Sequence, residues 1–455
     1  MPHTDSPGFL AGVIEGFYGQ PWAQAERLEL FRWMADWGLN TYFYGPKDDW
    51  KVRAIWREPY TDREAEPLRE LIRGCEQHHL HFVYALCPGL DIRYTNTADL
   101  DHLKRRCEQM HWLGCRHFAV LFDDIPDKMA REDLERFGTL ATAQAHVANA
   151  LFDWTRERSP QARFLFCPTP YCGRMAAAQL GGEGYLATLG KELREGIDIF
   201  WTGPEIISRE ITVAHVRDLR QLLRRKPLIW DNLHANDYDG RRFFCGPYAG
   251  RPRELRQEVA GLLTNPNCEF PLNYVPFRTL AEFVRGEGPW DPRAAYLSAL
   301  REWLPSFALS GPPITFEDLV LLGDCYYLPY EEGPQAIALH DLTKNLLARN
   351  PTQWGADAAA FRTQASRLRD VCARMTELRQ RTLFYALSRR LWELREEMDL
   401  LDRYVACRVA HPDPKATCGS DFHQPGTYRG GLVAKLQRLL VLQPNGNFTP
   451  APPIP

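Results

Sequence analysis

The 455-residue sequence lacks several patterns that mark particular classes of protein. No stretch approaches the roughly 18 consecutive apolar residues that a membrane-spanning helix requires. The N-terminal segment MPHTDSPGFLAG contains neither a basic start nor an apolar run of signal-peptide length. The net charge is −3 and no block of basic residues occurs, which argues against a nucleic-acid or anionic-membrane partner. We therefore expect a soluble globular protein.

Cysteine pairs at short spacing are also absent. The 12 cysteines are scattered over apolar segments and none forms a CxxC pair, whereas a structural zinc site needs short paired spacings. A secreted disulfide scaffold would be shorter and denser in cysteine. We expect mostly reduced, buried thiols, a cytoplasmic location, no metal site and no other cofactor.

Short apolar runs alternate with amphipathic stretches between residues 12 and 286. The length suits a barrel of about 250 residues followed by a second domain. The runs are continuously apolar, as expected where protein covers both faces of a parallel sheet, and the GxGxxG motif of open dinucleotide-binding sheets does not occur. The α/β pattern predicts a (β/α)8 TIM barrel whose strands lie at residues 12–16, 40–44, 81–85, 117–122, 163–167, 197–201, 227–231 and 261–264.

The character of the sequence changes after the predicted barrel. Helix-forming residues dominate from residue 290 to 408, and four leucines recur on one helical face, at Leu383, Leu387, Leu391 and Leu394. We predict a catalytic barrel at 1–288, a helical bundle domain at 289–410, and a loop-rich segment at 411–455 with one short helix near 432–442.

Polar and aromatic clusters follow nearly every predicted strand. In a barrel the carboxyl ends of the strands share one rim, and barrel enzymes place their chemistry there. Loops are polar in general, but these clusters combine Trp, Tyr, Asp and Asn, which suits the apolar faces and hydroxyl edges of a sugar ring. The clusters are EGFYGQPW, YGPKDDW, CPGLDIRY, DDIPD, CPTPYC, WTGPE, WDNLHANDYD and TNPN.

The adjacent carboxylates Asp123 and Asp124 are the leading catalytic candidates. They directly follow the apolar run HFAVLF and precede Ile125-Pro126, where the strand is expected to end or twist so that both side chains face one ligand. Two close carboxylates resist joint ionisation, so one of them can act as a general acid near neutral pH. The structural alternative is a helix cap or a solvated loop.

Three further clusters could have either a ligand-binding or a structural role. Asn232, Asn236, Asp237 and Tyr238 can bind hydroxyl groups or form an Asx-rich turn. The glycines of EGFYGQPW allow a ligand close to the backbone or serve a tight turn. Lys47 can reach a hydroxyl or lie on the surface.

The histidine spacings give only weak support for a metal site. His234 has no second histidine at ligand spacing, so we assign it a structural role. His79 and His81 form an HxH pattern, but they lie at the start of a predicted strand, which is the wrong end of a barrel for catalysis.

Eight motifs in chain order resemble glycoside hydrolase family 84, the O-GlcNAcases and related β-N-acetylglucosaminidases. They run from about Gly12 to Phe270: GVIEGFYGQPW, NTYFYGPKDDW, the aspartate pair, FCPTPYC, WTGPE, WDNLHANDYD, GPYAGR and LTNPNCEF. The resemblance implies a retaining exo-enzyme that removes O-linked GlcNAc from serine or threonine through an oxazoline intermediate. It also implies that the helical domain forms a homodimer, as it does in some relatives.

Residue roles follow from the same resemblance. Asp123 would orient and polarise the 2-acetamido group of the substrate, and Asp124 would protonate the leaving oxygen and later activate water. The sugar would be bound by the Gly16 backbone and Lys47 at ring hydroxyls, Tyr171 at the acetamide oxygen, Asn232 at the acetamido group, Asp237 at the 4- and 6-hydroxyls with Asn265 beside it, and Trp230 and Cys167 as walls of the acetamide methyl pocket.

Other functions stay open at this point. The same chemistry could act on a GlcNAc-containing polysaccharide such as hyaluronan or a chitin fragment. A silent module that binds GlcNAc-modified proteins would keep Asp237 and the aromatic rim without needing both carboxylates of the pair. A metal-dependent barrel hydrolase is disfavoured by the absence of paired ligand spacings.

Overall fold

The computed structural model describes residues 8–413, 416–419 and 430–452. Its first part is a closed barrel of eight parallel strands in which each strand pairs with the next and β1 pairs with β8. This confirms the predicted TIM barrel. The strands are β1 (Leu10–Glu15), β2 (Thr41–Tyr44), β3 (His81–Leu86), β4 (His117–Leu121), β5 (Phe164–Cys167), β6 (Ile197–Trp201), β7 (Leu228–Asp231) and β8 (Gly261–Thr264).

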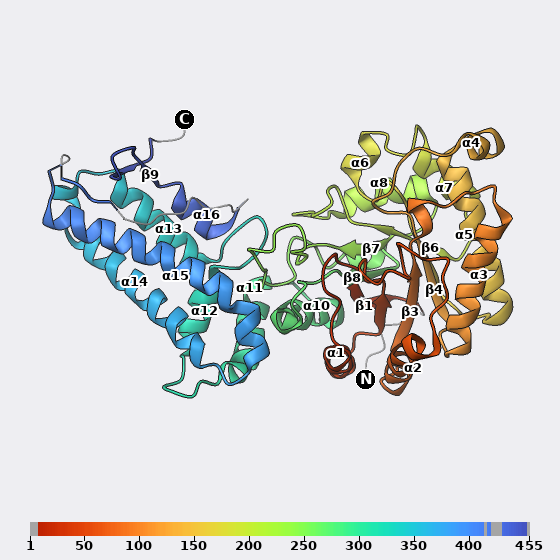
Figure 1. Cartoon of the computed structure of the whole chain (residues 1–455), viewed down its shortest axis with the longest axis horizontal. Coiled ribbons are helices and arrows are strands. Elements are labelled where there is room, and N and C mark those ends of the chain that lie inside the picture. Colours follow the sequence, from red (N-terminus) through yellow and green to blue (C-terminus); the bar gives the residue numbers. More distant parts are fainter. Residues whose placement is uncertain (1–7, 414–415, 420–429, 453–455) are drawn as a thin grey trace. The chain divides into compact units, whose positions relative to one another are not determined.

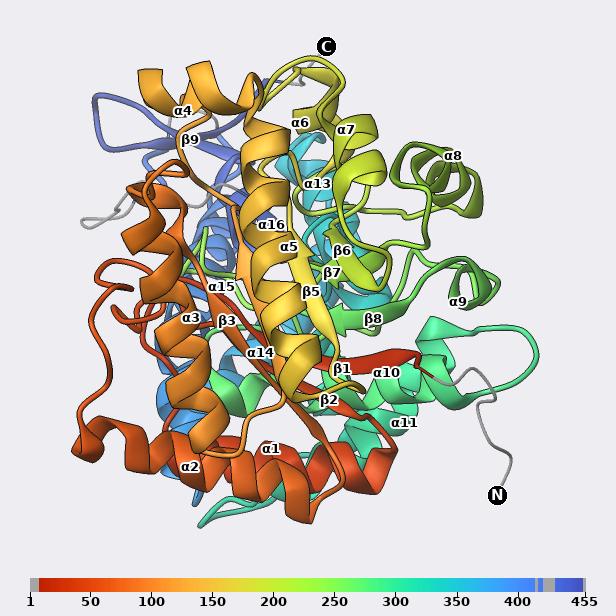
Figure 2. The same cartoon turned by 90° about the vertical axis from the view of Figure 1, so that its right-hand side faces the viewer.

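Helices surround the strands, and Figure 2 shows α1, α2, α3 and α5 on the outside of the barrel. In α2 the buried residues Leu68, Leu71, Ile72 and Cys75 recur at intervals of three or four, which gives one apolar face for the strands. The helices are α1 (Gln24–Trp37), α2 (Asp62–Gln77), α3 (Thr97–Trp112), α4 (Arg131–Phe137), α5 (Leu140–Arg158), α6 (Gly173–Ala177), α7 (Tyr185–Glu192), α8 (Val213–Leu223), α9 (Leu255–Glu258) and α10 (Tyr274–Arg285).

Local signals set several helix ends. Gly38 caps α1 in a left-handed conformation with a φ of 75°, which glycine adopts without steric cost. Thr61 begins α2 with a capping box, because its hydroxyl accepts the amide of Glu64 while the Glu64 carboxylate accepts the amide of Thr61. Short 3₁₀ turns, η1 (Pro88–Leu90) and η2 (Phe270–Asn273), follow β3 and β8.

Aromatic rings from distant strands fill the barrel interior. The ring centroids of Phe43 and Phe200 lie 5.5 Å apart, and those of Phe200 and Trp230 lie 5.2 Å apart, with tilted or edge-on planes. Such edge-to-face contacts are the favourable geometry for aromatic pairs. Because Trp230 belongs to the end of β7, this layer closes the barrel directly beneath the carboxyl-end rim.

The chain divides into two compact units (Figure 1). The barrel unit comprises residues 1–237, 248–270 and 277–291, and the second unit comprises 238–247, 271–276 and 292–455. The second unit is mainly helical: α11 (Pro292–Trp303), η3 (Leu304–Phe307), α12 (Phe316–Asp324), α13 (Pro334–Leu347), η4 (Pro351–Gln353), α14 (Gly355–Arg374), η5 (Met375–Glu377), α15 (Arg381–Ala410) and α16 (Gly431–Gln437), followed by β9 (Leu440–Leu442) and β10 (Phe448–Pro450).

The helical unit follows the predicted leucine pattern, with one correction near its end. Leu383, Leu387, Leu391 and Leu394 are all buried along α15. The short helix expected near 432–442 is wrong in its second half, because α16 ends at Gln437 and Leu440–Leu442 forms a strand. That strand pairs antiparallel with Phe448–Pro450, and Gly446 provides the turn with a φ of 79°.

Ten of the cysteines are free thiols, and nine of these are buried. Cys407 and Cys418 form a disulfide that ties the end of α15 to the segment after it.

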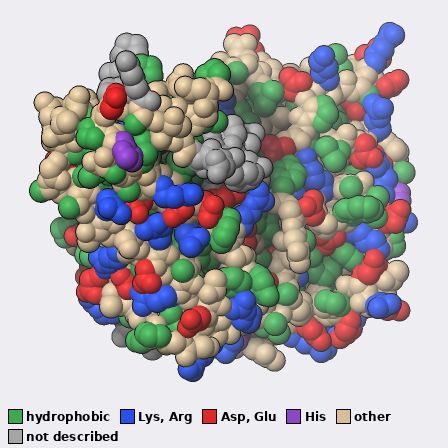
Figure 3. All heavy atoms as spheres, turned by 60° about the vertical axis from the view of Figure 1, so that its left-hand side comes forward, with side chains coloured by type: hydrophobic (Ala, Val, Ile, Leu, Met, Phe, Trp, Pro, Cys, Tyr) green, Lys and Arg blue, Asp and Glu red, His purple; other side chains and the backbone are tan. Residues whose placement is uncertain are grey.

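Within the described ranges, the helices include none with the length and apolarity required to cross a bilayer. Figure 3 shows a face on which basic, acidic and apolar side chains are interspersed, in keeping with the small net charge.

Candidate active site

The predicted site residues of the barrel unit all lie at or just after the carboxyl ends of its strands. Parallel strands bring these ends to one rim, which is where barrel enzymes bind substrates. Gly16 follows β1, Lys47 follows β2, Asp123 and Asp124 follow β4, Cys167 and Tyr171 lie at and after the end of β5, Trp230, Asn232 and Asp237 lie at and after the end of β7, and Asn265 follows β8.

The two aspartates occupy different surroundings. Asp123 is 6% exposed and forms an ion pair with the buried ammonium of Lys47, which follows β2. Asp124 is exposed and adopts a left-handed backbone with a φ of 50°. This conformation breaks the strand alternation after β4 and is uncommon for a residue with a side chain. Strand β4 therefore ends at Leu121, and the turn that follows it lies at Asp124.

Arg53 holds this turn from the loop after β2. Its guanidinium donates hydrogen bonds to the carbonyl oxygen of Asp124, at 2.7 Å, and to that of Asp123, at 3.4 Å. It also lies 5.9 Å from the ring centroid of Tyr18. Such fixed contacts are what a strained backbone needs to persist. The sequence analysis did not select Arg53, although it stands three residues after the YGPKDDW cluster.

Two tyrosine hydroxyls fix the side chain of Asp124. Tyr171 donates to Oδ1 at 2.8 Å, and Tyr18 donates to Oδ2 at 3.0 Å. Burial, and then the charge of Asp124, raises the pKa of Tyr171 well above its usual value, so that this hydroxyl keeps its proton at neutral pH. Burial likewise raises the pKa of Tyr18. The sequence analysis missed Tyr18 as a separate residue, although it belongs to the selected cluster EGFYGQPW.

Asp123 keeps one oxygen available. Its Oδ2 contacts Lys47, whereas its Oδ1 is buried and has no hydrogen-bond partner within the described part of the chain. Burial opposes the charge of Lys47, but Asp123 and other groups outweigh it, and the pKa of the ammonium lies above its usual value. A buried, unpaired carboxylate oxygen beside a fixed cation is a ready acceptor for an N–H donor.

An amide and indole cluster lies at the ends of β7 and β8. Asn232 Oδ1 accepts from Trp230 Nε1 and from Asn265 Nδ2, each at 3.0 Å. The Asn232 amide nitrogen donates to the carbonyl of Ile206 at 2.8 Å. These three bonds fix the orientation of the Asn232 amide. Asn265 Oδ1 is buried without a hydrogen-bond partner among the described residues, so it adds a second acceptor.

The walls of this cluster leave little room. A Cβ atom on Gly16 would lie 2.6 Å from Cζ2 of the Trp230 ring, so only glycine fits this approach of backbone to indole. The Lys47 ammonium lies 5.7 Å from the centre of the same ring. Cys167 is buried at the end of β5, and burial followed by the charge of Asp123 raises the pKa of its thiol well above the usual value. Cys167 is therefore a neutral, apolar wall.

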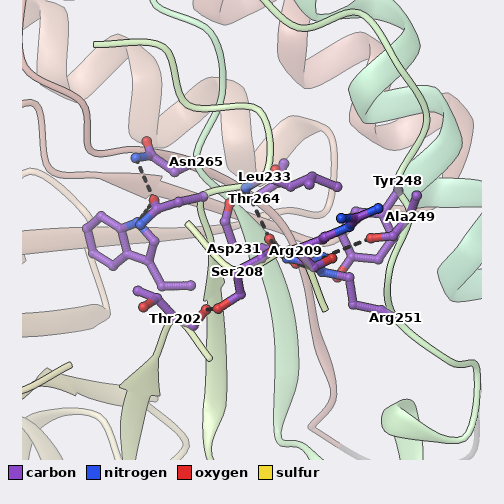
Figure 4. Close-up of polar contacts among 12 residues, drawn as sticks. Thr202, Ser208, Arg209, Asp231, Leu233, Tyr248, Ala249, Arg251, Thr264 and Asn265 are labelled. Atoms are coloured by element: carbon purple, nitrogen blue, oxygen red, sulfur yellow. Dashed lines mark hydrogen bonds and ion pairs between the residues drawn. The ribbon is translucent and has the colours of Figure 1, made fainter. Parts of the chain in front are cut away.

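A buried ion pair supports β7 from outside the barrel. Asp231 lies between Trp230 and Asn232, so strand alternation turns its side chain to the other face. Arg251 donates to both Asp231 oxygens at 2.8 and 2.7 Å, and Tyr248 donates to Oδ2 at 2.8 Å (Figure 4). Arg251 also binds the carbonyls of Ser208 and Arg209. This network joins the loops after β6 and β7. Tyr248 and Arg251 belong to the motif GPYAGR, but no role could be assigned to them from the sequence.

The rest of the WDNLHANDYD cluster divides into separate roles. Asp237 Oδ2 accepts the Tyr18 amide at 3.0 Å, which brings Asp237 to the same side as the catalytic candidates. Asn236 crosslinks to the loop after β8, since it accepts the Cys268 amide at 2.8 Å and donates to Glu269 at 3.0 Å. Tyr238 belongs to the second unit. His234 is fully buried.

Two other polar groups serve the barrel framework. Glu15 is fully buried and receives two hydrogen bonds from Arg27, at 2.8 and 2.6 Å. His81 contacts His117 at 3.2 Å at the amino ends of β3 and β4. Burial, and then the charge of His81, lowers the pKa of His117 to about 4. Among the residues that the structure describes, no group of three or more His, Cys, Asp and Glu side chains could hold a metal ion.

Comparisons with known proteins show the family of the chain. The family model of the β-N-acetylglucosaminidases matches residues 11–309. The chain is 47% identical over 277 residues to protein O-GlcNAcase of Rattus norvegicus and of Mus musculus; the match covers 61% of this chain and only 30% of each relative. A solved structure of a mutant Thermobaculum terrenum O-GlcNAc hydrolase is similar with a TM-score of 0.78 and 26% identity, over 88% of this chain and 84% of that chain. The chain belongs to the β-N-acetylglucosaminidase family, glycoside hydrolase family 84.

Proposed function

We propose that this chain is a retaining exo-β-N-acetylglucosaminidase that removes O-linked GlcNAc from serine or threonine of proteins. The observation that carries the proposal is the difference between the surroundings of the two aspartates. Asp123 is buried against a cation with one oxygen unpaired, and Asp124 is exposed and held by two hydroxyls. Such unequal surroundings are typical of two carboxylates with different catalytic roles.

The first half of the reaction uses the amide of the substrate as nucleophile. The acetamide N–H donates to Asp123, the acetamide oxygen attacks the anomeric carbon, and the bond to the leaving oxygen breaks as Asp124 protonates that oxygen. The product is an oxazoline whose developing positive charge is stabilised by the Asp123 carboxylate. In the second half Asp124 takes a proton from water, the water oxygen attacks the anomeric carbon, and the oxazoline opens. Two inversions retain the configuration.

The remaining residues bind the sugar in this proposal. Tyr171 exchanges its hydrogen bond with Asp124 for one to the acetamide oxygen, and Trp230 and Cys167 enclose the acetamide methyl group. The ring hydroxyls are bound by Gly16, Lys47 and Asp237, with Asn232 and Asn265 beside them. The contacts that join Asn232 to Trp230 and Asn265 support a preformed pocket.

Substitution of Asp124 by Asn tests the assignment. We expect D124N to lose at least about 100-fold in kcat on a GlcNAc-serine peptide, whose leaving group needs a proton, and far less on an aryl GlcNAc with an acidic phenol. The control is a matched aryl glucoside, which lacks the acetamide and should not turn over with the wild-type chain. Wild-type-like hydrolysis of the glycopeptide by D124N, or equal rates on the glucoside, would refute the mechanism.

Two alternatives are outcomes of the same measurements. Faster turnover of hyaluronan or chitin fragments than of glycopeptides would assign a polysaccharide substrate. Measurable GlcNAc binding without hydrolysis would assign a binding module. We also propose a homodimer through the helical unit, which is supported by two exposed aromatic residues seven positions apart on α15, Tyr385 and Trp392.

A further inference from the structure

A hollow of about 230 Å³ lies between the loop after β3 and the loop after β4. Both loops belong to the carboxyl-end rim. The residues that line the hollow combine apolar and charged side chains, and they include Leu90, Ile92, Arg93, Pro126, Lys128 and Met129. None of them takes part in the sugar site described above.

The hollow is continuous with the loop that carries Asp124. Pro126 is part of its wall and stands two residues after Asp124. Ile125 packs against the opposite loop, since a Cβ on Gly89 would lie 2.6 Å from its Cγ2 atom. Under the proposed function, on which this inference rests, Asp124 touches the oxygen that leaves with serine or threonine. The residues next to that serine or threonine must therefore pass close to this loop.

The wall of the hollow is preformed on the β3 side. Asp91 accepts from Trp56 Nε1 at 2.8 Å and from Arg57 at 2.6 Å, which fixes the loop after η1. The amide of Thr95 donates to Asp133 at 2.7 Å, which ties the same loop to α4. A binding pocket that is rigid before its ligand arrives loses less entropy when it binds.

The side chains of the hollow indicate which kind of ligand it can bind. Leu90 is 44% exposed, so it offers an apolar contact at the edge of the hollow. Arg93 and Lys128 are exposed and carry no ion pair within the described ranges, whereas the negative charge of Asp91 is matched by Arg57. Asp127 stands in the same loop but does not line the hollow. The surface thus offers an apolar contact beside two uncompensated positive charges.

We propose that this hollow is an aglycone subsite, which receives an apolar side chain and an adjacent acidic residue of the GlcNAc-bearing protein close to the modified serine or threonine. The apolar side chain covers Leu90 and Ile92, and the acidic residue pairs with Lys128 or Arg93. The subsite gives the enzyme a preference for particular sequences around the modified serine or threonine, whereas the sugar pocket recognises only the GlcNAc.

The test compares one aryl GlcNAc with GlcNAc-serine peptides that carry Leu-Glu or Gly-Lys on either side of the serine. The variants are K128E and L90S in the full chain, and the matched control is K191E, an exposed charge reversal in the last turn of α7. We expect K128E and L90S to lower kcat/KM on a Leu-Glu peptide by about tenfold, mainly through KM, and to leave the aryl substrate within about twofold. K191E should act like wild type on all substrates.

Two results would overturn the subsite. One is equal kcat/KM of the wild-type chain on Leu-Glu and Gly-Lys peptides, and the other is an equal loss on aryl and peptide substrates in K128E. Binding of fluorescent glycopeptides to D124N provides a readout without turnover, and a Leu-Glu preference there that disappears in the K128E/D124N double variant would support the subsite even if hydrolysis fails. Failure of the aryl substrate with the wild-type chain would instead count against the proposed function.

Discussion

At the scale of single residues, the hydroxyl of Tyr18 has a testable effect on Asp124. It donates one of the two hydrogen bonds that fix this carboxylate, and Tyr18 is 41% exposed, so its loss should leave folding intact. A hydrogen bond contributes about 1 kcal/mol, and about 1.4 kcal/mol is tenfold in rate. We expect Tyr18→Phe to lower kcat about fivefold with KM little changed. Tyr171→Phe should lose more, because under the proposed mechanism it also contacts the acetamide.

Steady-state kinetics on a GlcNAc-serine peptide, whose leaving group needs a proton, measures both tyrosine variants, with thermal unfolding as the check on folding. A Tyr18→Phe enzyme with unchanged kcat would show that Tyr171 alone positions the acid. A larger loss of kcat in Tyr171→Phe than in Tyr18→Phe would indicate that Tyr171 also binds the substrate, whereas Tyr18 only positions Asp124.

The sequence pointed to the acidic pair but not to the residues that hold it. Asp123 and Asp124 could be found because they follow an apolar strand directly. The contacts of Arg53 and Tyr18 with them join residues 71 and 106 positions apart, and no local pattern encodes such pairs. Arg251 belongs to the motif GPYAGR, but its pairing with Asp231, 20 positions away, could not be predicted for the same reason.

At the scale of secondary structure, Glu397 makes the stability of α15 depend on pH. Its carboxyl group is buried, and burial raises its pKa from 4.5 to about 7, with Gln437 partly opposing the shift. Because the folded protein holds this proton more tightly than the unfolded chain, the contribution is fully present below about pH 4.5 and is lost as the pH rises through about 7. The loss is on the order of 3 kcal/mol at most, since each pKa unit is about 1.4 kcal/mol.

Glu397→Gln removes the titrating group and keeps its shape. We expect this variant to unfold at higher urea concentration than the wild-type chain at pH 8 and to differ little at pH 5. Glu396→Gln, the exposed neighbour, is the matched control and should not change the pH dependence. An equal effect of Glu397→Gln at both pH values would contradict the role of burial.

Element positions were predictable where the signal is local. The bounds of β6 and β8 agree with the predicted strands. Leu440–Leu442 was assigned to a helix because its pairing with Phe448–Pro450 depends on a partner strand that a helical pattern cannot reveal. Strand β1 likewise begins two residues earlier than predicted, where Leu10 pairs with Gly261 of β8.

At the scale of the whole molecule, the exposed stripe on α15 predicts self-association. Tyr385 is 68% exposed and Trp392 is 59% exposed, and burial of such rings is a main source of interface stability. We expect light scattering after gel filtration to give twice the 52.4 kDa chain mass, and Trp392→Glu to shift the protein to the monomer. Trp112→Glu on α3, where the indole is 81% exposed, is the matched control. A wild-type monomer at micromolar concentration would contradict the dimer.

The division into domains at 1–288, 289–410 and 411–455 stays a prediction.

The left-handed backbone of Asp124 also limits what can be engineered at this position. Aspartate, asparagine and glycine tolerate such dihedral angles, whereas longer or branched residues adopt them at a cost. A glutamate, the usual way to give an acid more reach, would meet the same steric penalty and displace its carboxyl group. If Asp124 is the acid, as proposed, a designer who wants to adapt the site to bulkier leaving groups has to rebuild the turn held by Arg53 before changing Asp124 itself.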